Sequence, residues 1–396
     1  MASRETAVVI IGAGQAGLSV AYYLQKLGMR PGVEMLVLDR GPRTGGAWQH
    51  RWESLRLGSA HRVHDLPGMR QTGLSFETAD RTAAAGDVVA EYYAEYEEFY
   101  GLDVQRPVSV LAVHDRGADL VLQTTAGEVT ALAVVNATGT WGAPFVPYYP
   151  GIREFRGRQL HTSTYVSAEE FRGRTVLVVG GGTSAIGFLL ELEGIADRTY
   201  WAARRPIDYL DHGALDLEDA VAAVEQQDRA ARRGRALPSI VSGTGVPKTR
   251  RIAAGIERGV LEARGMFTRF DEDGVVWADG TRDDVDAVIW ATGFRPDIRH
   301  LSPLRLHEKQ GGITVSTGAA EKDPRIFFAG YGPTASTIGA NRAGRTIARQ
   351  VYSLVGEWRP REGAAGGPMP LADGDADEGA PTTDAVSMLS RFFSDD

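Results

Sequence analysis

The stretch AVVIIGAGQAG, residues 7–17, decides the fold of this chain. It begins with an unbroken apolar run, Ala7–Ile11, which is typical of a parallel strand buried on both faces. Three glycines follow at the spacing GxGxxG. Gly12 permits a tight turn, Gly14 lets the backbone approach a pyrophosphate, and Gly17 lets a helix pack closely on the strand. The stretch therefore predicts a strand, a phosphate-binding turn and the start of a helix.

The residues after this loop complete a βαβ unit. An apolar helix is predicted over about 15–27, and a second buried strand, EMLVLD, over 34–39. This strand ends on Asp39, where a carboxylate accepts hydrogen bonds from a ribose diol, and Arg40 follows it. The alternative, a glycine-rich turn without a nucleotide, leaves this order of features unexplained. We predict a dinucleotide here, with its phosphates at the helix N-terminus.

A second glycine loop, VVGGGTSAIG at residues 178–187, follows another buried strand, 175–179, and begins a second βαβ unit. The next strand, 199–203, is followed by Arg204 and Arg205 rather than by an acid. Arginine matches a 2′-phosphate in a bidentate fork, whereas an acid would repel it. This favours NADPH over NADH; the alternative is that both arginines are merely solvated. The candidate contacts in the loop are Gly180, Gly182, Thr183, Ser184 and Ala185, with Ala185 where a third glycine would stand.

Between the two loops lies FRGRQLHTSTY, residues 155–165, with the pattern FxGxxxHxxxY. Two dinucleotide loops with this string between them resemble the flavin-containing monooxygenases and their Baeyer–Villiger relatives. The resemblance covers roughly the first 350 residues. It implies an α/β fold of two doubly wound dinucleotide-binding (Rossmann-like) domains, with the NADPH domain inserted into the FAD domain. The string ends on Tyr165, where Baeyer–Villiger enzymes favour Trp, so it leans towards the branch that oxygenates heteroatoms.

The domain organisation follows from this resemblance. We expect an FAD-binding domain over 1–168 and 294–356, and an NADPH-binding domain over 169–293. A polar stretch, about 206–250, matches no part of a nucleotide fold and is predicted to be an insertion that covers a site. Residues 357–396 are rich in Gly, Pro, Ala and Asp, which predicts a flexible tail that includes one short amphipathic helix at 385–393. The other predicted elements are a helix at 85–100, a β-meander at 108–113, 119–124 and 131–136, strands at 287–292 and 325–330, and a last helix at 339–354.

The resemblance also implies further cofactor contacts. Gly45 and Gly46 before Trp48 are typical of a segment that passes over the FAD pyrophosphate and reaches the isoalloxazine ring. The alternative for Trp48 is an ordinary core position. Two ATG strings mark where the chain crosses between the domains, although each is also an ordinary strand exit. The contacts implied by these segments and by the last strand are Gly46, Trp48, Thr138, Gly139, Thr292, Gly293 and Gly330.

The catalytic candidates come from two places. In the family, the histidine of the string positions or gates the nicotinamide cofactor rather than acting as a base, and here it is His161. The family commonly carries an Asn beside the flavin, but the only asparagines of this chain, Asn136 and Asn341, are elsewhere. The corresponding stretch, LRLGSAHRVHDLPG at residues 55–68, is closer to the plant auxin-forming flavin enzymes. It offers Ser59, His61 and His64, of which Ser59 and His61 join His161 as the catalytic candidates.

The implied activity is that of an NADPH- and FAD-dependent monooxygenase. It would insert one oxygen atom from O2 into a small molecule through a C4a-(hydro)peroxyflavin, by N- or S-oxygenation, oxidative decarboxylation or Baeyer–Villiger chemistry. The missing Asn supports an alternative, an NADPH oxidase or flavin reductase that releases hydrogen peroxide. A second alternative is a flavoprotein without enzyme activity.

Composition narrows the function classes. The 396 residues carry a net charge of −8, which argues against a nucleic-acid partner and, more weakly, against an anionic membrane surface. Cysteine is absent, so dithiol–flavin reductases, disulfides and thiolate metal sites are excluded. The eight histidines lack ligand spacing, and no metal is predicted. We expect a cytoplasmic protein, since no signal peptide or apolar run of about 20 residues is present, and a homodimer stays open.

Overall fold

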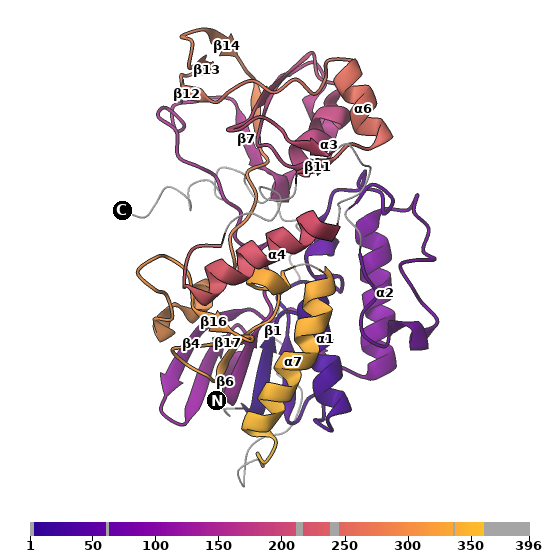
Figure 1. Cartoon of the computed structure of the whole chain (residues 1–396), viewed down its shortest axis with the longest axis vertical. Coiled ribbons are helices and arrows are strands. Elements are labelled where there is room, and N and C mark those ends of the chain that lie inside the picture. The colour runs from indigo at the N-terminus through magenta and orange to yellow at the C-terminus, as the bar shows by residue number, and fades with distance from the viewer. Residues whose placement is uncertain (1–3, 61–62, 211–216, 238–244, 336, 360–396) are drawn as a thin grey trace. The chain divides into compact units, whose positions relative to one another are not determined.

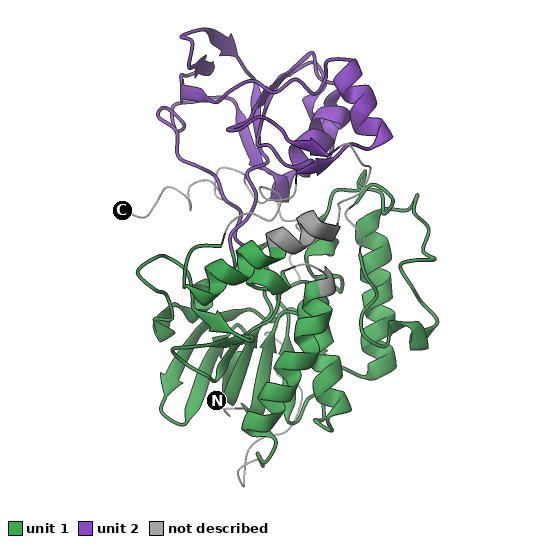
Figure 2. Cartoon of the chain, viewed as in Figure 1, with its two compact units in different colours: residues 1–142, 224–238, 296–375 green, residues 143–223, 239–295, 376–396 purple. Residues whose placement is uncertain are grey.

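The computed structural model describes residues 4–60, 63–210, 217–237, 245–335 and 337–359, and these form two compact units (Figures 1 and 2). Unit 1 takes the described residues within 1–142, 224–238 and 296–375, and unit 2 takes those within 143–223 and 239–295. The sequence analysis predicted domain boundaries at 168/169 and 293/294. The chain passes between the two units at 142/143, 223/224, 238/239 and 295/296, so part of the predicted insertion, 224–238, belongs to unit 1.

The sheet of unit 1 is built around β1, whose apolar run is buried as its continuous β-branched sequence requires. The predicted strands at 7–11 and 34–39 are confirmed. The parallel strands, in spatial order, are β18 (Ile326–Phe328), β6 (Gly127–Asn136), β1 (Arg4–Ile11), β2 (Met35–Leu38) and β3 (Val104–Gln105). Two short antiparallel strands, β17 (Ala319–Ala320) and β16 (Val315–Ser316), extend the edge beyond β18.

The predicted β-meander is present, but its third strand is also a central strand of the parallel sheet. β4 (Val110–Arg116) pairs with β5 (Asp119–Thr124), and β5 pairs antiparallel with β6. Residues 129–132 of β6 alternate between buried and half-buried, whereas its last four residues are all buried beside β1. One long strand therefore serves both pairings, and the meander is not a separate insertion.

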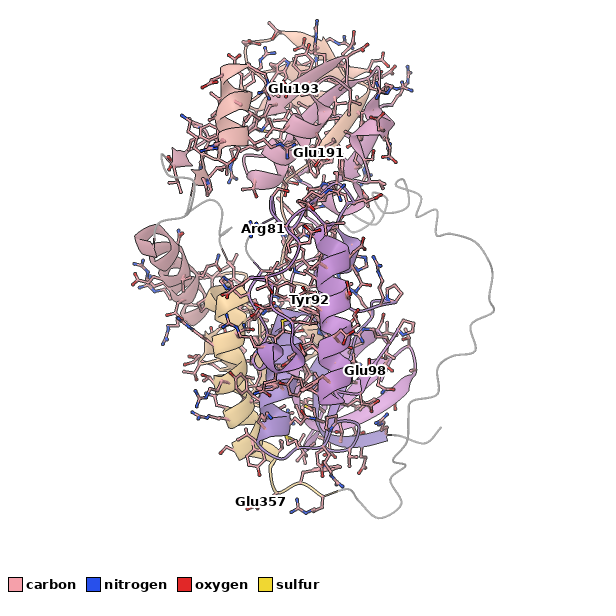
Figure 3. The ribbon with its side chains drawn as sticks, turned by 90° about the vertical axis from the view of Figure 1, so that its right-hand side faces the viewer. Arg81, Tyr92, Glu98, Glu191, Glu193 and Glu357 are labelled. Carbon is pink, nitrogen blue, oxygen red and sulfur yellow. The ribbon has the colours of Figure 1, made fainter. Side chains whose placement is uncertain are left out.

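Three helices of unit 1 lie where the sequence predicted them. α1 (Gln15–Lys26) packs directly on α7 (Thr337–Val355), where the absence of a side chain on Gly344 leaves room for Ser19. α2 (Ala85–Tyr100) turns Tyr93 and Tyr96 inward and carries Glu98 on its exposed face (Figure 3). A further helix, α4 (Leu217–Arg232), lies within the predicted insertion, and its residues from 224 onward belong to unit 1.

Unit 2 contains a second parallel sheet, as the second βαβ unit predicted. Its strands, in spatial order, are β7 (Arg158–His161), β15 (Ala287–Trp290), β8 (Thr175–Val179) and β9 (Arg198–Ala202). An aromatic core that includes Phe267, Phe270 and Trp290 joins this sheet to a small antiparallel sheet. The remaining elements are α3 (Thr183–Leu192), α6 (Arg250–Glu257), β10 (Tyr209–Leu210), β11 (Val246–Pro247), β12 (Phe267–Phe270), β13 (Gly274–Trp277) and β14 (Arg282–Asp284). The predicted α/β class, with two parallel sheets, is confirmed.

Some predictions fall outside the described residues, namely the helix at 385–393, the tail from residue 360 and His61. Among the residues that the structure does describe, no helix has both the length and the apolar composition needed to cross a membrane.

Candidate functional site

The first glycine loop is open at its second glycine only. Gly12 has φ +104°, and a Cβ there would lie 2.5 Å from the carbonyl oxygen of Ala137. A Cβ on Gly17 would overlap the carbonyl oxygen of Gly12. Gly14 is different, since the nearest atom to its Cβ would be the Cα of Gly46 at 3.9 Å. Gly14 is also the N-cap of α1 and no side chain caps it, so free N–H groups of the first turn face this open space. These residues fit a pyrophosphate.

The Gly45–Gly46 segment lies directly on this loop. Gly46 has φ +52°, and a Cβ there would come within 2.7 Å of the Cα of Gly14. Trp48 follows and is buried, which agrees with the alternative interpretation that it is an ordinary core residue. The structure thus brings together the two segments that the sequence analysis assigned to one pyrophosphate, although Trp48 as a flavin contact stays a prediction.

The carboxylate of Asp39 is fixed against the same loop. Its Oδ2 accepts a hydrogen bond from the backbone N–H of Ala13 at 2.7 Å, and its Oδ1 accepts one from Gly41 at 2.7 Å. Each oxygen keeps a second lone pair for a ribose hydroxyl. Arg40, in contrast, points to Asp297 and forms an ion pair of 2.8 Å with it. Arg40 therefore holds the chain where it re-enters unit 1, and its role as a cofactor contact stays a prediction.

The two ATG strings repeat one contact in both units. A Cβ on Gly180 would overlap the carbonyl oxygen of Ala291, just as a Cβ on Gly12 would meet that of Ala137. The third residue of each string, Gly139 or Gly293, has a left-handed φ of +63° or +80°. Each ATG turn is therefore packed against the first glycine of its own loop, which explains why the strings occur as a pair.

The threonines of these strings hold the chain where it enters each unit. The Thr138 hydroxyl donates a hydrogen bond to the carbonyl oxygen of Asp297 at 2.5 Å. The Thr292 hydroxyl donates one to the carbonyl oxygen of Phe145. Asp297 and Phe145 come just after the boundaries at 295/296 and 142/143, so both threonines have a structural role here, and their cofactor contacts stay predictions.

The second glycine loop presents unpaired positive charge. Gly182 is the N-cap of α3, and the predicted contacts Thr183, Ser184 and Ala185 form its first turn. Arg204 and Arg205 are exposed after β9, and neither has an ion pair or hydrogen bond with another described residue. No described carboxylate neutralises them, so both arginines fit a phosphate.

The FxGxxxHxxxY string builds part of the second sheet, which the sequence analysis did not anticipate. Its centre is β7, the strand beside β15. Phe155 belongs to the aromatic core, and a Cβ on Gly157 would overlap the Phe155 ring. Tyr165 packs on Phe188 with ring centroids 4.2 Å apart, and its hydroxyl donates to Glu191. Three of the four residues that define the string are therefore explained by packing.

His161 is fixed in its neutral form. Its Nε2 lies 2.9 Å from the carbonyl oxygen of Gly293, which only accepts, so Nε2 carries the proton. Its Nδ1 accepts a hydrogen bond from the backbone N–H of Ser163 at 3.1 Å. Burial lowers the pKa of His161 to about 4. With both nitrogens occupied, the ring fits the predicted positioning role rather than that of a base, because it ties the end of β7 to the second ATG turn.

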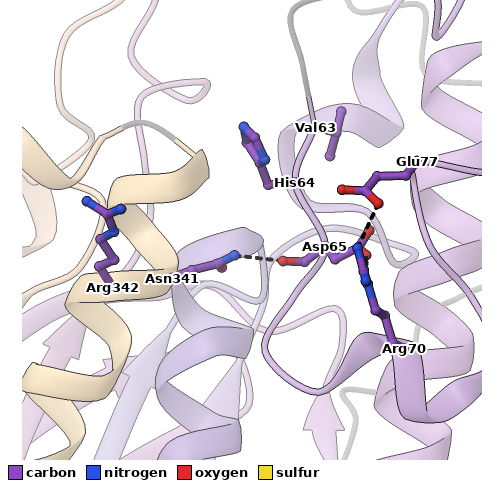
Figure 4. A pocket seen from close by; sticks show the side chains of 7 residues that line it. All are labelled: Val63, His64, Asp65, Arg70, Glu77, Asn341 and Arg342. Carbon is purple, nitrogen blue, oxygen red and sulfur yellow. Dashed lines mark hydrogen bonds and ion pairs between the residues drawn. The ribbon is translucent and has the colours of Figure 1, made fainter. Parts of the chain in front are cut away.

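The stretch that replaces the family's Asn segment lines a hollow of unit 1. Ser59 is exposed and its hydroxyl donates to the carbonyl oxygen of Arg56 at 3.0 Å, so this structure gives no support for a catalytic Ser59. His64 is half-buried. The hollow measures about 290 Å³ and is lined by Val63, His64, Asp65, Arg70, Glu77, Asn341 and Arg342 (Figure 4).

A part-buried chain of hydrogen bonds holds the wall of this hollow. Tyr93 donates to Gln15 Oε1 at 2.5 Å, and Gln15 Nε2 donates to Asn341 Oδ1 at 2.8 Å. Asn341 Nδ2 then donates to the carbonyl oxygen of Asp65 at 2.7 Å, and Gln15 Nε2 also reaches the carbonyl oxygen of His64. Backbone carbonyls only accept, so they fix the orientation of both amides. Sequence reasoning missed this chain of hydrogen bonds, because it considered Asn341 as an asparagine outside the expected place and as the end of a segment, 337–341, that fits the last FAD contact.

Known proteins resemble this chain in sequence and in fold. Residues 9–209 match the family described as pyridine nucleotide-disulphide oxidoreductase. The flavin-containing monooxygenase of Stenotrophomonas maltophilia is 34% identical, with a TM-score of 0.74 over 88% of this chain and 99% of that one. This chain belongs to the flavin-containing monooxygenases. Its relatives are flavin-dependent monooxygenases, and this family depends on FAD and NADPH.

Curated relatives of this monooxygenase cover less of it. The rice (Oryza sativa subsp. japonica) indole-3-pyruvate monooxygenase YUCCA1 is 34% identical over 48% of this chain and 46% of its own length. The senecionine N-oxygenase of Tyria jacobaeae is 28% identical over 50% of this chain and 46% of its own length. The chain spans about half the length of the curated relatives it matches.

Proposed function

We propose that this chain is an FAD- and NADPH-dependent monooxygenase that inserts one oxygen atom from O2 into a small molecule. The observation that carries the proposal is the pair of glycine loops, each at the N-terminus of a helix that follows a buried parallel strand. When bound, the cofactors supply hydride transfer from NADPH to FAD and the reaction of reduced FAD with dioxygen.

The residues of unit 1 are assigned to FAD. The first turn of α1 binds the pyrophosphate over Gly14, and Asp39 accepts the ribose hydroxyls with its free lone pairs. In unit 2, Arg204 and Arg205 bind the 2′-phosphate of NADPH, since no described residue neutralises them. His161 stays neutral and positions the Gly293 turn. The substrate is oxygenated at nitrogen, at sulfur or at a carbonyl carbon.

A second candidate function is an NADPH oxidase that releases hydrogen peroxide. The observation that favours it is the Ser59–His64 stretch, which has no Asn and whose Ser59 faces solvent. The two functions are separated by measuring oxygenated product and peroxide per NADPH consumed, with amines, sulfides, ketones and indole-type acids. A monooxygenase forms close to one product per NADPH with at least one class. One peroxide per NADPH with every class would establish the oxidase instead.

A further inference from the structure

A cation of unit 1 is stacked between two indole rings. The Arg51 guanidinium carbon lies 4.4 Å from the ring centroid of Trp141 and 5.5 Å from that of Trp48. His50 stacks on Trp141, with ring centroids 6.1 Å apart and ring planes 7° apart. These four side chains form a column, and a guanidinium held this way keeps its plane and its edge in a fixed orientation.

Arg51 has no anionic partner among the residues that the structure describes. No described carboxylate lies within 4 Å of it, its guanidinium makes no hydrogen bond to a described residue, and its Nε is buried without a partner. Arg40, Arg106 and Arg325 of the same unit each form an ion pair of 2.8 Å or less. Burial lowers the pKa of Arg51 to about 10, so the group stays charged at neutral pH. Arg51 is half-buried, so a charge without an anionic partner is costly there, and cation–π contacts offset only part of that cost.

The column lies beside the open nucleotide loop. Trp48 comes two residues after Gly46, which lies on Gly14. Trp141 comes two residues after Gly139, the end of the ATG turn that packs on Gly12. Arg51 therefore lies between the two segments that border the first glycine loop, where a ligand of unit 1 brings its charged groups.

We propose that Arg51 is an anion-binding residue that completes its hydrogen bonds with an oxyanion of a ligand bound to unit 1. Two sources share this chemistry, the pyrophosphate of FAD and the carboxylate of an acidic substrate. Contacts with Trp48 and Trp141 restrict the orientation of the planar guanidinium, which favours a bidentate contact. The inference rests on the proposed function for the identity of these ligands, whereas the affinity for an oxyanion does not depend on it.

The first arm of the test measures ligand binding by the full chain without cofactor. Inorganic pyrophosphate is titrated while tryptophan fluorescence is followed, and FAD and riboflavin are titrated separately. Arg51→Gln removes the charge, Arg51→Lys keeps it without the planar fork, and Arg43→Gln is the control, an arginine of the same segment that is 56% exposed. If FAD is the source, Arg51→Gln weakens pyrophosphate and FAD binding about tenfold to a hundredfold and leaves riboflavin unchanged. Arg51→Lys falls between, and Arg43→Gln matches the unmutated protein.

The second arm uses the protein loaded with FAD. Benzoate and benzamide, which differ in charge but not in size, are titrated against the flavin absorption spectrum. If a substrate carboxylate is the source, Arg51→Gln keeps its FAD affinity and loses the preference for benzoate. Equal affinities of the folded Arg51→Gln variant and the unmutated protein for pyrophosphate, FAD and benzoate would overturn the proposal. If the unmutated chain binds no FAD, the proposed function fails, but the pyrophosphate titration still decides the role of Arg51.

Discussion

Asn341→Asp is the substitution that most directly tests the hydrogen-bond chain behind the hollow of unit 1. The change keeps the shape of the side chain and its acceptor for Gln15, but it replaces the Nδ2 donor with an oxygen that faces the carbonyl of Asp65. A buried acceptor that loses its donor costs about 1–3 kcal/mol; this hydrogen bond is part-buried, and the two facing acceptors of the variant add repulsion to the loss of the donor. At neutral pH, Asn341→Asp should therefore lower the free energy of unfolding by about 2 kcal/mol or more relative to the unmutated protein. This loss should exceed the loss caused by Asn341→Ala.

The pH dependence of the stability of Asn341→Asp tests which atom of residue 341 donates to Asp65. The introduced carboxyl group can donate to the carbonyl of Asp65 only when it is protonated, so the folded state raises the pKa of that group. The folded state then binds more protons than the unfolded state, and the deficit relative to the unmutated protein shrinks as pH falls through the raised pKa. Urea unfolding of the three proteins at pH 7.5 and pH 5 measures this. The assigned direction of these hydrogen bonds is refuted if Asn341→Asp is as stable as the unmutated protein at pH 7.5. It is also refuted if the stability that this variant lacks relative to the unmutated protein is no smaller at pH 5 than at pH 7.5.

The two loops and His161 give three further predictions. Gly14→Val should fold yet lose bound FAD, because the valine side chain fills space at the first glycine loop that is open in the protein. The control Gly265→Val, at a glycine that also has no close neighbours, should keep its FAD and its yellow colour. Equal flavin content of the two variants would contradict the assigned pyrophosphate site. Replacing Arg204 and Arg205 with Gln should raise the NADPH concentration needed for flavin reduction about tenfold to a hundredfold and leave that for NADH unchanged, as stopped-flow reduction would show. The pKa of His161 is lowered to about 4, so neutral His161 contributes its full stabilisation above pH 6.5, and this contribution is lost by about 1.4 kcal/mol per pH unit as pH falls towards 4. Between pH 6.5 and pH 4.5, the free energy of unfolding of His161→Gln should therefore fall less steeply than that of the unmutated protein. Parallel slopes of the two proteins would contradict this assignment.

Local sequence determined the framework of both units. The unbroken apolar runs at 7–11 and 176–179 became buried parallel strands, because a strand covered on both faces is built mostly from apolar side chains. The glycine spacing identified both loops, because a tight turn and a close helix–strand contact need residues without Cβ. The two arginines after β9 could also be identified as candidate phosphate contacts, since this prediction needed only their positive charge and their position in the sequence.

Tertiary structure decided what the remaining residues do. No period or spacing reveals that Gln15 meets Asn341, 326 residues away, or that His161 donates to Gly293, 132 residues away. The same holds for Arg51, whose two stacking rings and missing carboxylate depend on how the segments around Gly46 and Gly139 fold together. Sequence patterns report the local backbone and the buried face of one element, whereas the protonation, orientation and pairing of a polar side chain depend on neighbours that only the folded chain supplies.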